Sequence, residues 1–140
     1  MRPRILITVV LLAGAIAIPA LASGEARRVV GNCTTSQVRP ATIVIYCADA
    51  NAALTHLRWN SFGGASASAS GSYHENDCKP NCAAGHFHDY AVRVVLSKAR
   101  ACPDKHDDYR RATLAFTGSR PSDVKSSRVT ISLPGCPIGS

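Results

Sequence analysis

The sequence has few aromatic residues and little charge of either sign. Its 140 residues include one Trp, four Tyr and three Phe, and charged residues make up 18% of the chain. The basic residues are scattered, adjacent only at Arg27–Arg28 and Arg110–Arg111, and they do not interleave with the aromatic residues. Binding of single-stranded nucleic acid relies on such interleaving. We therefore predict that nucleic acid is not a partner of this protein.

Only one long apolar run is present, and it lies at the N-terminus. Two arginines precede an apolar run over residues 5–18, and small residues follow it as far as Ala22. This order is typical of a signal peptide, and we predict cleavage after Ala22. The prediction divides the chain into a signal peptide, residues 1–22, and a single secreted domain, residues 23–140. A retained N-terminal anchor is the alternative, although the run is shorter than the about 20 residues of a membrane-spanning helix.

Removal of the signal peptide leaves a mildly basic domain. The formal net charge falls from +7 for the whole chain to +5, because Arg2 and Arg4 are lost. An acidic polymer of the cell envelope is one partner that this charge would suit. No later apolar stretch reaches the length of a membrane span, so we expect no membrane association after cleavage.

Helical periodicity is also absent, and short stretches of β-type residues take its place. No window of helical length carries a clear 3.6-residue apolar repeat, whereas several segments alternate with period two. We predict an all-β domain of about six to seven strands, stapled by disulfides. An immunoglobulin-like β-sandwich is our first choice and a small barrel is the alternative. The expected strands cover residues 42–47, 54–62, 65–73, 90–97, 109–116 and 127–133.

The Ala/Ser-rich segment at 65–73 can be read in two ways. Such a composition is common in flexible linkers. A hairpin with residues 54–62 is the other interpretation, because a three-residue loop over 62–64 would place Trp59 opposite Ala67 and Leu57 opposite Ala69. That register puts apolar residues on one face, and it predicts Trp59 as an anchor of the core.

Six cysteines lie in the predicted secreted domain, and an even number in an oxidising compartment indicates disulfides. Fifteen pairings are possible, and we favour the three that close local loops. A crosslink across about 15 residues contributes roughly 3 kcal/mol to stability in the chain-entropy model. The favoured pairs are Cys33 with Cys47, Cys78 with Cys82, and Cys102 with Cys136.

The segment HENDCKPNCAAGHFHDY, residues 74–90, concentrates two cysteines and three histidines. A zinc site of two cysteines and two histidines would need a helix, which Pro80 and Gly85 oppose. A redox motif would need two residues between the cysteines, where this loop has three. A metal site formed by His74, His86 and His88 is the remaining alternative, and copper or zinc would suit it. We predict a disulfide-stapled loop, with no metal and no cofactor.

No recognisable catalytic motif occurs in the chain. A nucleophile elbow, a metalloprotease helix and a landmark pair of carboxylates are all missing from the sequence. The acid-rich turn at Asp107–Asp108 beside His106 fits a solvated loop better than a general-acid site. We predict no catalytic residues, and an enzyme whose residues converge only after folding stays open as an alternative.

Two stretches in this order, IVIYCADANAALTHLRW over 43–59 and ENDCKPNCAAG over 75–85, resemble a family of small secreted disulfide-containing proteins of actinobacteria. That family carries no established activity, so the resemblance transfers no functional residue. Size, composition and a short-range disulfide are also similar to those of the immunoglobulin-like apoproteins of the enediyne antibiotics, an analogy of fold alone. We therefore predict a binding or structural module of the extracellular space or cell envelope, with an unknown ligand. The alternatives are a metal-binding protein using the loop histidines and a small extracellular enzyme.

Overall fold

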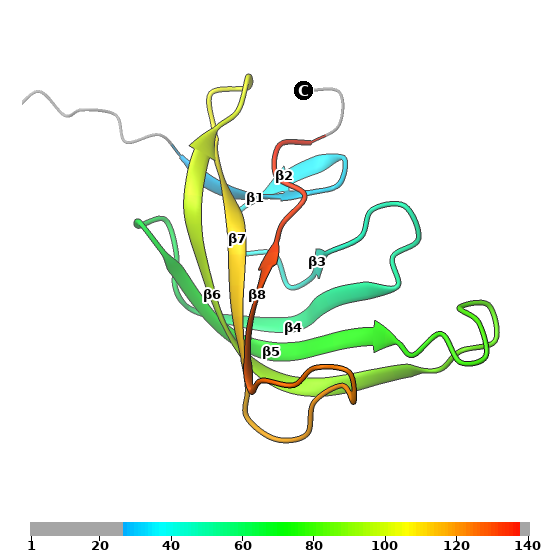
Figure 1. Cartoon of the computed structure of the whole chain (residues 1–140). Helices are drawn as coiled ribbons and strands as arrows, with labels where there is room; N and C mark the ends of the chain where they lie inside the picture. The colour runs from blue at the N-terminus through cyan, green and yellow to red at the C-terminus, as the bar shows by residue number, and fades with distance from the viewer. Residues whose placement is uncertain (1–26, 138–140) are drawn as a thin grey trace, which may run out of the picture.

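The computed structural model describes residues 27–137 (Figure 1). The predicted signal peptide, residues 1–22, lies outside these residues. Every regular element from 27 to 137 is a β-strand, which confirms the all-β prediction, and none of this part is a helix able to span a membrane. The eight strands are β1 (Arg28–Asn32), β2 (Thr35–Gln37), β3 (Ile43–Val44), β4 (Ala52–Ser61), β5 (Ala67–Asn76), β6 (Phe87–Ala101), β7 (Asp107–Phe116) and β8 (Arg128–Ser132).

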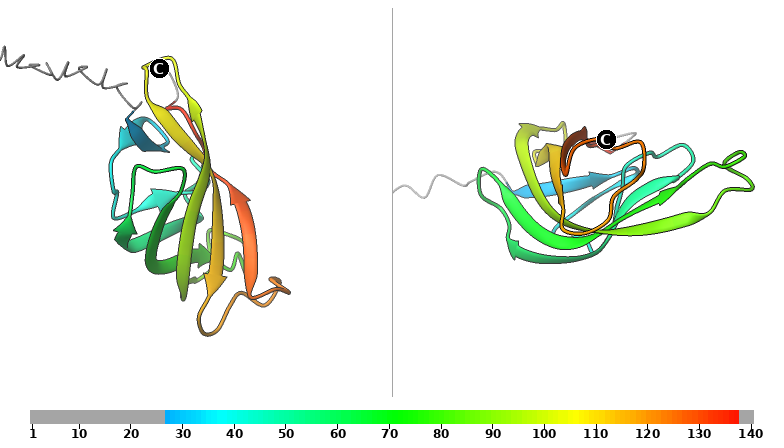
Figure 2. Two further views of the ribbon diagram at one scale, coloured as in Figure 1. Left: turned by 90° about the vertical axis from the view of Figure 1, so that its left-hand side faces the viewer. Right: turned by 60° about the horizontal axis from the view of Figure 1, so that its bottom comes forward.

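The eight strands form one sheet, in the order β2-β1-β7-β6-β5-β4-β3, with β8 also paired to β7. β1 and β7 run parallel, and every other neighbouring pair is antiparallel. The 15-residue strand β6 bends along its length, so that the sheet curls into a half-barrel (Figures 1 and 2). The immunoglobulin-like sandwich is therefore not confirmed, because a sandwich needs two separate sheets packed face to face.

The curl brings the two ends of the strand order close together. The side chain of Asn32, at the end of β1, accepts a 3.0 Å hydrogen bond from the backbone N–H of Val44 in β3. Its amide group also donates to the carbonyl of Thr42 at 3.1 Å. The disulfide between Cys33 and Cys47 joins the same two segments, with the two Cα atoms 5.5 Å apart. One amide side chain and one disulfide thus close the gap that backbone pairing leaves open.

Two further disulfides complete the set. Cys78 is bonded to Cys82 within the β5–β6 loop, and Cys102 is bonded to Cys136. All six cysteines are paired in the combination that the sequence favoured. The Cys102–Cys136 bond attaches the C-terminal segment to the turn between β6 and β7, a separation of 34 residues.

The core fills the concave face of the sheet. It includes fully buried aliphatic residues on six of the strands and the ring of Tyr109. Trp59 is half-buried against this cluster, and its indole N–H donates a 2.9 Å hydrogen bond to the carbonyl of Pro40. The largest fully buried apolar side chains are Val30, Ile43, Leu54, Val94, Leu96, Tyr109 and Leu114.

The Ala/Ser-rich segment is strand β5, so the linker interpretation is wrong. The predicted pairing with β4 is also wrong, since Trp59 lies opposite Ala69 and not opposite Ala67. The turn is longer than the predicted three residues, because the pair nearest to it joins Ser61 to Ser68. Two irregularities in β4, between Thr55 and Arg58 and between Trp59 and Ser61, then change the register along the strand. The predicted separation of faces nevertheless holds, because both alanines are buried.

The largest differences from the predicted strands are at β1, β2 and β3. The expected strand at 42–47 is reduced to the two residues Ile43–Val44, and a turn over residues 47–49, which contains the disulfide-bonded Cys47, follows it. β1 and β2 were not expected. β1 is short and contains Gly31, which weakens the strand signal in its sequence. An added Cβ at Gly31 would overlap the carbonyl of Gly135, so the C-terminal segment requires glycine there.

Candidate functional site: a polar groove beside the stapled loop

Strands β5 and β6 extend beyond the rest of the sheet and carry the histidine-rich loop at their tip (Figure 1). His74 pairs with Asp89 and Glu75 pairs with His88, so these two pairs are neighbours in the ladder. Successive residues of a strand point to opposite faces of a sheet. Glu75 and His88 therefore share the concave face with the core, while His74 and Asp89 share the convex face.

The three histidines do not converge on one point. The ring of His74 stacks on Phe87, with ring centroids 4.6 Å apart, and its Nδ1 atom is 3.1 Å from a carboxylate oxygen of Asp89. His88 lies on the other face and contacts Asp77. Within residues 27–137, the only trio of metal-binding side chains whose ligand atoms lie close together contains Cys102, Asp108 and Cys136, and its two sulfurs are bonded to each other. The alternative of a histidine metal site is therefore not supported by the geometry.

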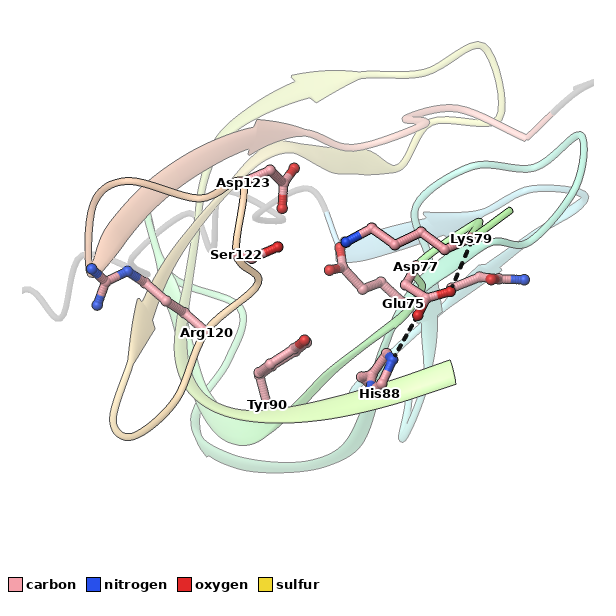
Figure 3. A pocket seen from close by; sticks show the side chains of 9 residues that line it. Glu75, Asp77, Lys79, His88, Tyr90, Arg120, Ser122 and Asp123 are labelled. Atoms are coloured by element: carbon pink, nitrogen blue, oxygen red, sulfur yellow. Dashed lines mark hydrogen bonds and ion pairs between the residues drawn. The ribbon is translucent and has the colours of Figure 1, made fainter. Parts of the chain in front are cut away.

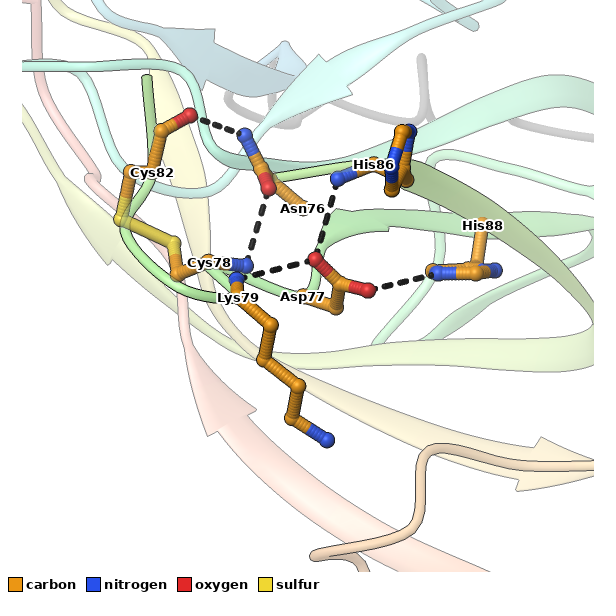
Figure 4. A network of polar contacts seen from close by, with 7 residues as sticks. All are labelled: Asn76, Asp77, Cys78, Lys79, Cys82, His86 and His88. Atoms are coloured by element: carbon orange, nitrogen blue, oxygen red, sulfur yellow. Dashed lines mark hydrogen bonds and ion pairs between the residues drawn. A yellow bond between two sulfur atoms is a disulfide. The ribbon is translucent and has the colours of Figure 1, made fainter. Parts of the chain in front are cut away.

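Asp77 organises the loop at its start (Figure 4). Its Oδ1 atom accepts hydrogen bonds from the backbone N–H groups of Lys79, at 3.1 Å, and of His86, at 3.0 Å. Its Oδ2 atom lies 3.1 Å from Nε2 of His88. The backbone bond from His86 and the contacts with His88 and Lys79 lower the pKa of Asp77 below its ordinary value. The carboxylate is therefore ionised at neutral pH and holds both arms of the loop.

Asn76 and the disulfide fix the other side of the loop. The side-chain amide of Asn76 donates a 2.8 Å hydrogen bond to the carbonyl of Cys82, and its oxygen accepts one of 2.9 Å from the N–H of Cys78. Gly85 packs against this amide so closely that an added Cβ would overlap Asn76 Oδ1. The loop is thus held by side-chain bonds from within, and its shape does not depend on packing against the core.

A groove of about 560 Å³ lies between this loop and the segment that joins β7 to β8 (Figure 3). The β5–β6 hairpin supplies one wall and the segment around Arg120 supplies the other, with Tyr90 between them. Its volume is in the range of sites that hold small molecules. The lining residues are Glu75, Asn76, Asp77, Lys79, His88, Tyr90, Arg120, Ser122 and Asp123.

Glu75 differs from Asp77 in the direction in which the groove changes its pKa. Burial raises its pKa, a hydrogen bond with Tyr73 opposes the change, and the negative charge of Asp123 adds to it. The phenol groups of Tyr73 and Tyr90 are affected in turn, and burial together with the charge of Glu75 raises the pKa of each. The phenol groups of Tyr73 and Tyr90 therefore remain protonated near neutral pH, and each can donate a hydrogen bond.

Comparison with models of protein families, with curated proteins and with solved structures finds no match to this chain. The resemblance to the actinobacterial family accordingly stays a prediction.

Sequence reasoning missed the groove because its two walls are far apart in the chain. Glu75 and Asp77 lie in the histidine-rich segment 74–90. The other wall is formed by Arg120, Ser122 and Asp123, which lie in a turn without a sequence motif. A partial signal was available in the period-two alternation. When the alternation of β6 is extended backwards from Tyr90 to residue 88, it places His88 on the core face.

Proposed function

We propose that the protein is a secreted binding module and that the polar groove holds a hydroxyl-rich ligand, such as one or two sugar units of an extracellular or cell-envelope polymer. The observation that carries this proposal is the mixed lining of the groove. Lys79 and Arg120 supply donors, while Glu75 and Asp123 supply acceptors. The charges nearly balance, so the lining does not favour a strongly ionic ligand.

A hydroxyl group suits this lining because it donates and accepts hydrogen bonds at once. Neighbouring hydroxyls of a sugar can accept from a cation and donate to a carboxylate within one ring. Tyr90 stands in the groove between the two walls and offers a flat ring against which an apolar face of a sugar can pack (Figure 3). The loop beside it is ordered by Asp77 and the disulfide, so little conformational entropy would be lost on binding.

Secretion is part of the same proposal. Three disulfides fit an oxidising compartment outside the cytosol. The mass of the protein recovered from culture medium tests the predicted processing, since a chain beginning at Ser23 with six hydrogens lost is expected. A chain recovered only with cells and still carrying residues 1–22 would overturn secretion.

Binding is tested by NMR titration of the oxidised protein with glucose, N-acetylglucosamine and the β-1,4-linked dimer of each. Saturable shifts are expected for the backbone amides of residues 75–79, 88–90 and 120–123 with at least one of these probes. Glu75→Gln, which keeps the shape of the side chain, is expected to weaken that binding at least tenfold. Absence of saturable shifts with all four probes would overturn the proposal.

Asp89→Asn is the matched control. Asp89 lies on the same hairpin, one position away from the residue that pairs with Glu75, but it faces the convex side. Its affinity for the sugar is expected to equal that of the unmodified protein. If Asp89→Asn weakens binding as much as Glu75→Gln does, the groove is not the site.

A further inference from the structure

A second hollow, of about 720 Å³, lies where β6, β7 and β8 run side by side, and its lining is strongly basic. Two cations come from β6 and two from β7, and no carboxylate lines it. The lining residues are Lys98, Arg100, Arg110, Arg111, Ser132 and Leu133. They differ from those of the polar groove at every position, so this hollow is a separate feature of the surface.

The ladder explains how four cations gather here. Arg111 pairs with Ser97 on one side and with Ser132 on the other, so its neighbours across the sheet are small. Lys98 has a left-handed backbone, with φ of 57°, which interrupts the regular alternation of β6. The interruption lies next to Ser97, the ladder partner of Arg111. The cations of β6 and β7 border the same hollow there.

Three of these cations have no ionic partner. Among residues 27–137, the ion pairs involve Arg28 and three histidines, and none involves Lys98, Arg100 or Arg111. Arg110 is the exception. It lies against Gly135, its Nη2 atom is 2.7 Å from the sulfur of Cys136, and the charge of the buried Asp108 acts on it from behind.

Like charges on neighbouring strands repel each other and reduce stability. Four cations border the hollow, and the carboxylate that lies beside them is that of the buried Asp108, the ladder partner of Arg100. One carboxylate cannot balance four cations, so a bound anion would reduce the remaining repulsion. Arginine is suited to this task, because its planar guanidinium group donates two parallel hydrogen bonds to an oxyanion.

We propose that this basic hollow binds a phosphate or sulfate group. A tetrahedral oxyanion presents three or four oxygens, so it can accept from several cations at once, and the hydroxyl group of Ser132 adds a neutral donor. The group can be a free inorganic anion or an ester on a larger extracellular molecule. The hollow is open to solvent at Lys98, Arg100 and Arg111, which are all exposed, so an attached ester has room to enter.

The test uses the oxidised protein at low ionic strength, where surface charges are least screened. The probes are inorganic phosphate, inorganic sulfate and glycerol 3-phosphate. Saturable NMR shifts are expected at residues 98–100, 110–111 and 132, together with a higher melting temperature at saturating anion. Tight binding of glycerol 3-phosphate would assign the site to an ester, and binding of the inorganic ions alone would assign it to a free anion.

The variant Lys98→Ala/Arg111→Ala removes two of the four cations and is expected to weaken anion binding at least tenfold. Arg110 is left in place, since it packs on Gly135 and the disulfide. The control Arg58→Ala/Arg128→Ala removes the same charge from exposed positions of β4 and β8 outside the hollow, and its affinity is expected to stay within twofold.

Equal weakening in both double variants would overturn the proposal, because net charge alone would then explain binding. Absence of any saturable shift in the unmodified protein would overturn it as well. Should Lys98→Ala/Arg111→Ala not fold, the single variant Arg100→Ala provides the same comparison, with Arg58→Ala as its control. Neither outcome bears on the sugar titration, which monitors different residues.

Discussion

The hydroxyl group of Tyr109 donates a 2.7 Å hydrogen bond to the carbonyl of Gly64, 45 residues earlier in the chain. Arg28 donates to the same oxygen at 2.8 Å. Tyr109 is fully buried, and its ring meets Phe62 edge to face at 5.7 Å. One carbonyl of the β4–β5 turn thus connects that turn to β7 and to β1.

Replacement of Tyr109 by Phe removes one of the two donors and is expected to cost about 1 kcal/mol in the free energy of unfolding. The cost is moderate because Arg28 still satisfies the carbonyl. Urea unfolding of Tyr109→Phe, Arg28→Ala and the double variant measures the coupling. The double variant should lose more than the two single losses added together. Strict additivity would show that the two donors do not share the acceptor in solution.

Gly71 is expected not to tolerate a side chain. It lies across from the irregular part of β4, where His56 has a left-handed φ of 53°. A Cβ atom at Gly71 would lie 2.5 Å from the carbonyl oxygen of Thr55. Gly71→Ala is therefore expected to cost about 1–3 kcal/mol. Gly118→Ala, where an added Cβ meets no atom within 4 Å, serves as the control and should stay within about 0.5 kcal/mol of the unmodified protein in thermal unfolding.

The fold could be predicted from the sequence as far as local alternation reveals it. β5, β6 and β7 were recognised because buried and exposed residues alternate along them, as in Tyr90 to Leu96. The pairing of β4 with β5 could not be predicted, since neither the length of the turn after Ser61 nor the irregularity at His56 leaves a pattern in side-chain type. The single curled sheet was missed for a similar reason. A bend in one long strand and two separate sheets produce the same period-two sequence.

The candidate site was predictable only in its parts. Cysteine spacing located the stapled loop, but the convergence of His74 with His88 failed because adjacent ladder positions point to opposite faces. The segment around Arg120 forms the second wall of the groove. It lies too far along the chain from residues 75–90 for any motif spacing to connect the two.

Asp108 is expected to reduce stability at neutral pH. The residue is fully buried, and neither carboxylate oxygen has a hydrogen-bond partner within residues 27–137. Burial raises its pKa, while the positive charge of Arg110 opposes the change. A folded-state pKa above the unfolded value means that stability falls as the pH rises through the folded-state pKa.

Asp108→Asn is therefore expected to stabilise the protein by roughly 1 kcal/mol at pH 7. The difference should vanish below about pH 3, where the unfolded carboxyl is also protonated. Chemical unfolding at a series of pH values measures this. Asp107→Asn removes the neighbouring charge, which pairs with Arg28 at 3.4 Å near the surface, and it should bring no gain at any pH. A destabilised Asp108→Asn at pH 7 would show that the buried carboxylate has a partner.

The amide of Asn32 is expected to contribute to closure of the sheet. Asn32→Ala removes the bonds to Val44 and Thr42 and should cost about 1–2 kcal/mol. Asn32→Asp keeps an acceptor for the N–H of Val44 but cannot donate to the carbonyl of Thr42, so it should also be destabilised. Hydrogen exchange at the amide of Val44 is the direct measurement. Unchanged exchange in both variants would show that the Cys33–Cys47 bond alone joins the two ends.

One edge of β7 is paired with two different strands, β1 and β8. β1 occupies it at residues 107–108, and β8 occupies it at residues 111–115. Loss of the β8 pairing would expose unpaired backbone groups of β7 at residues 111–115, and such an edge is where another chain can add. Protection of this edge against strand addition therefore depends on β8 and on the Cys102–Cys136 bond that holds the segment after β8 in place.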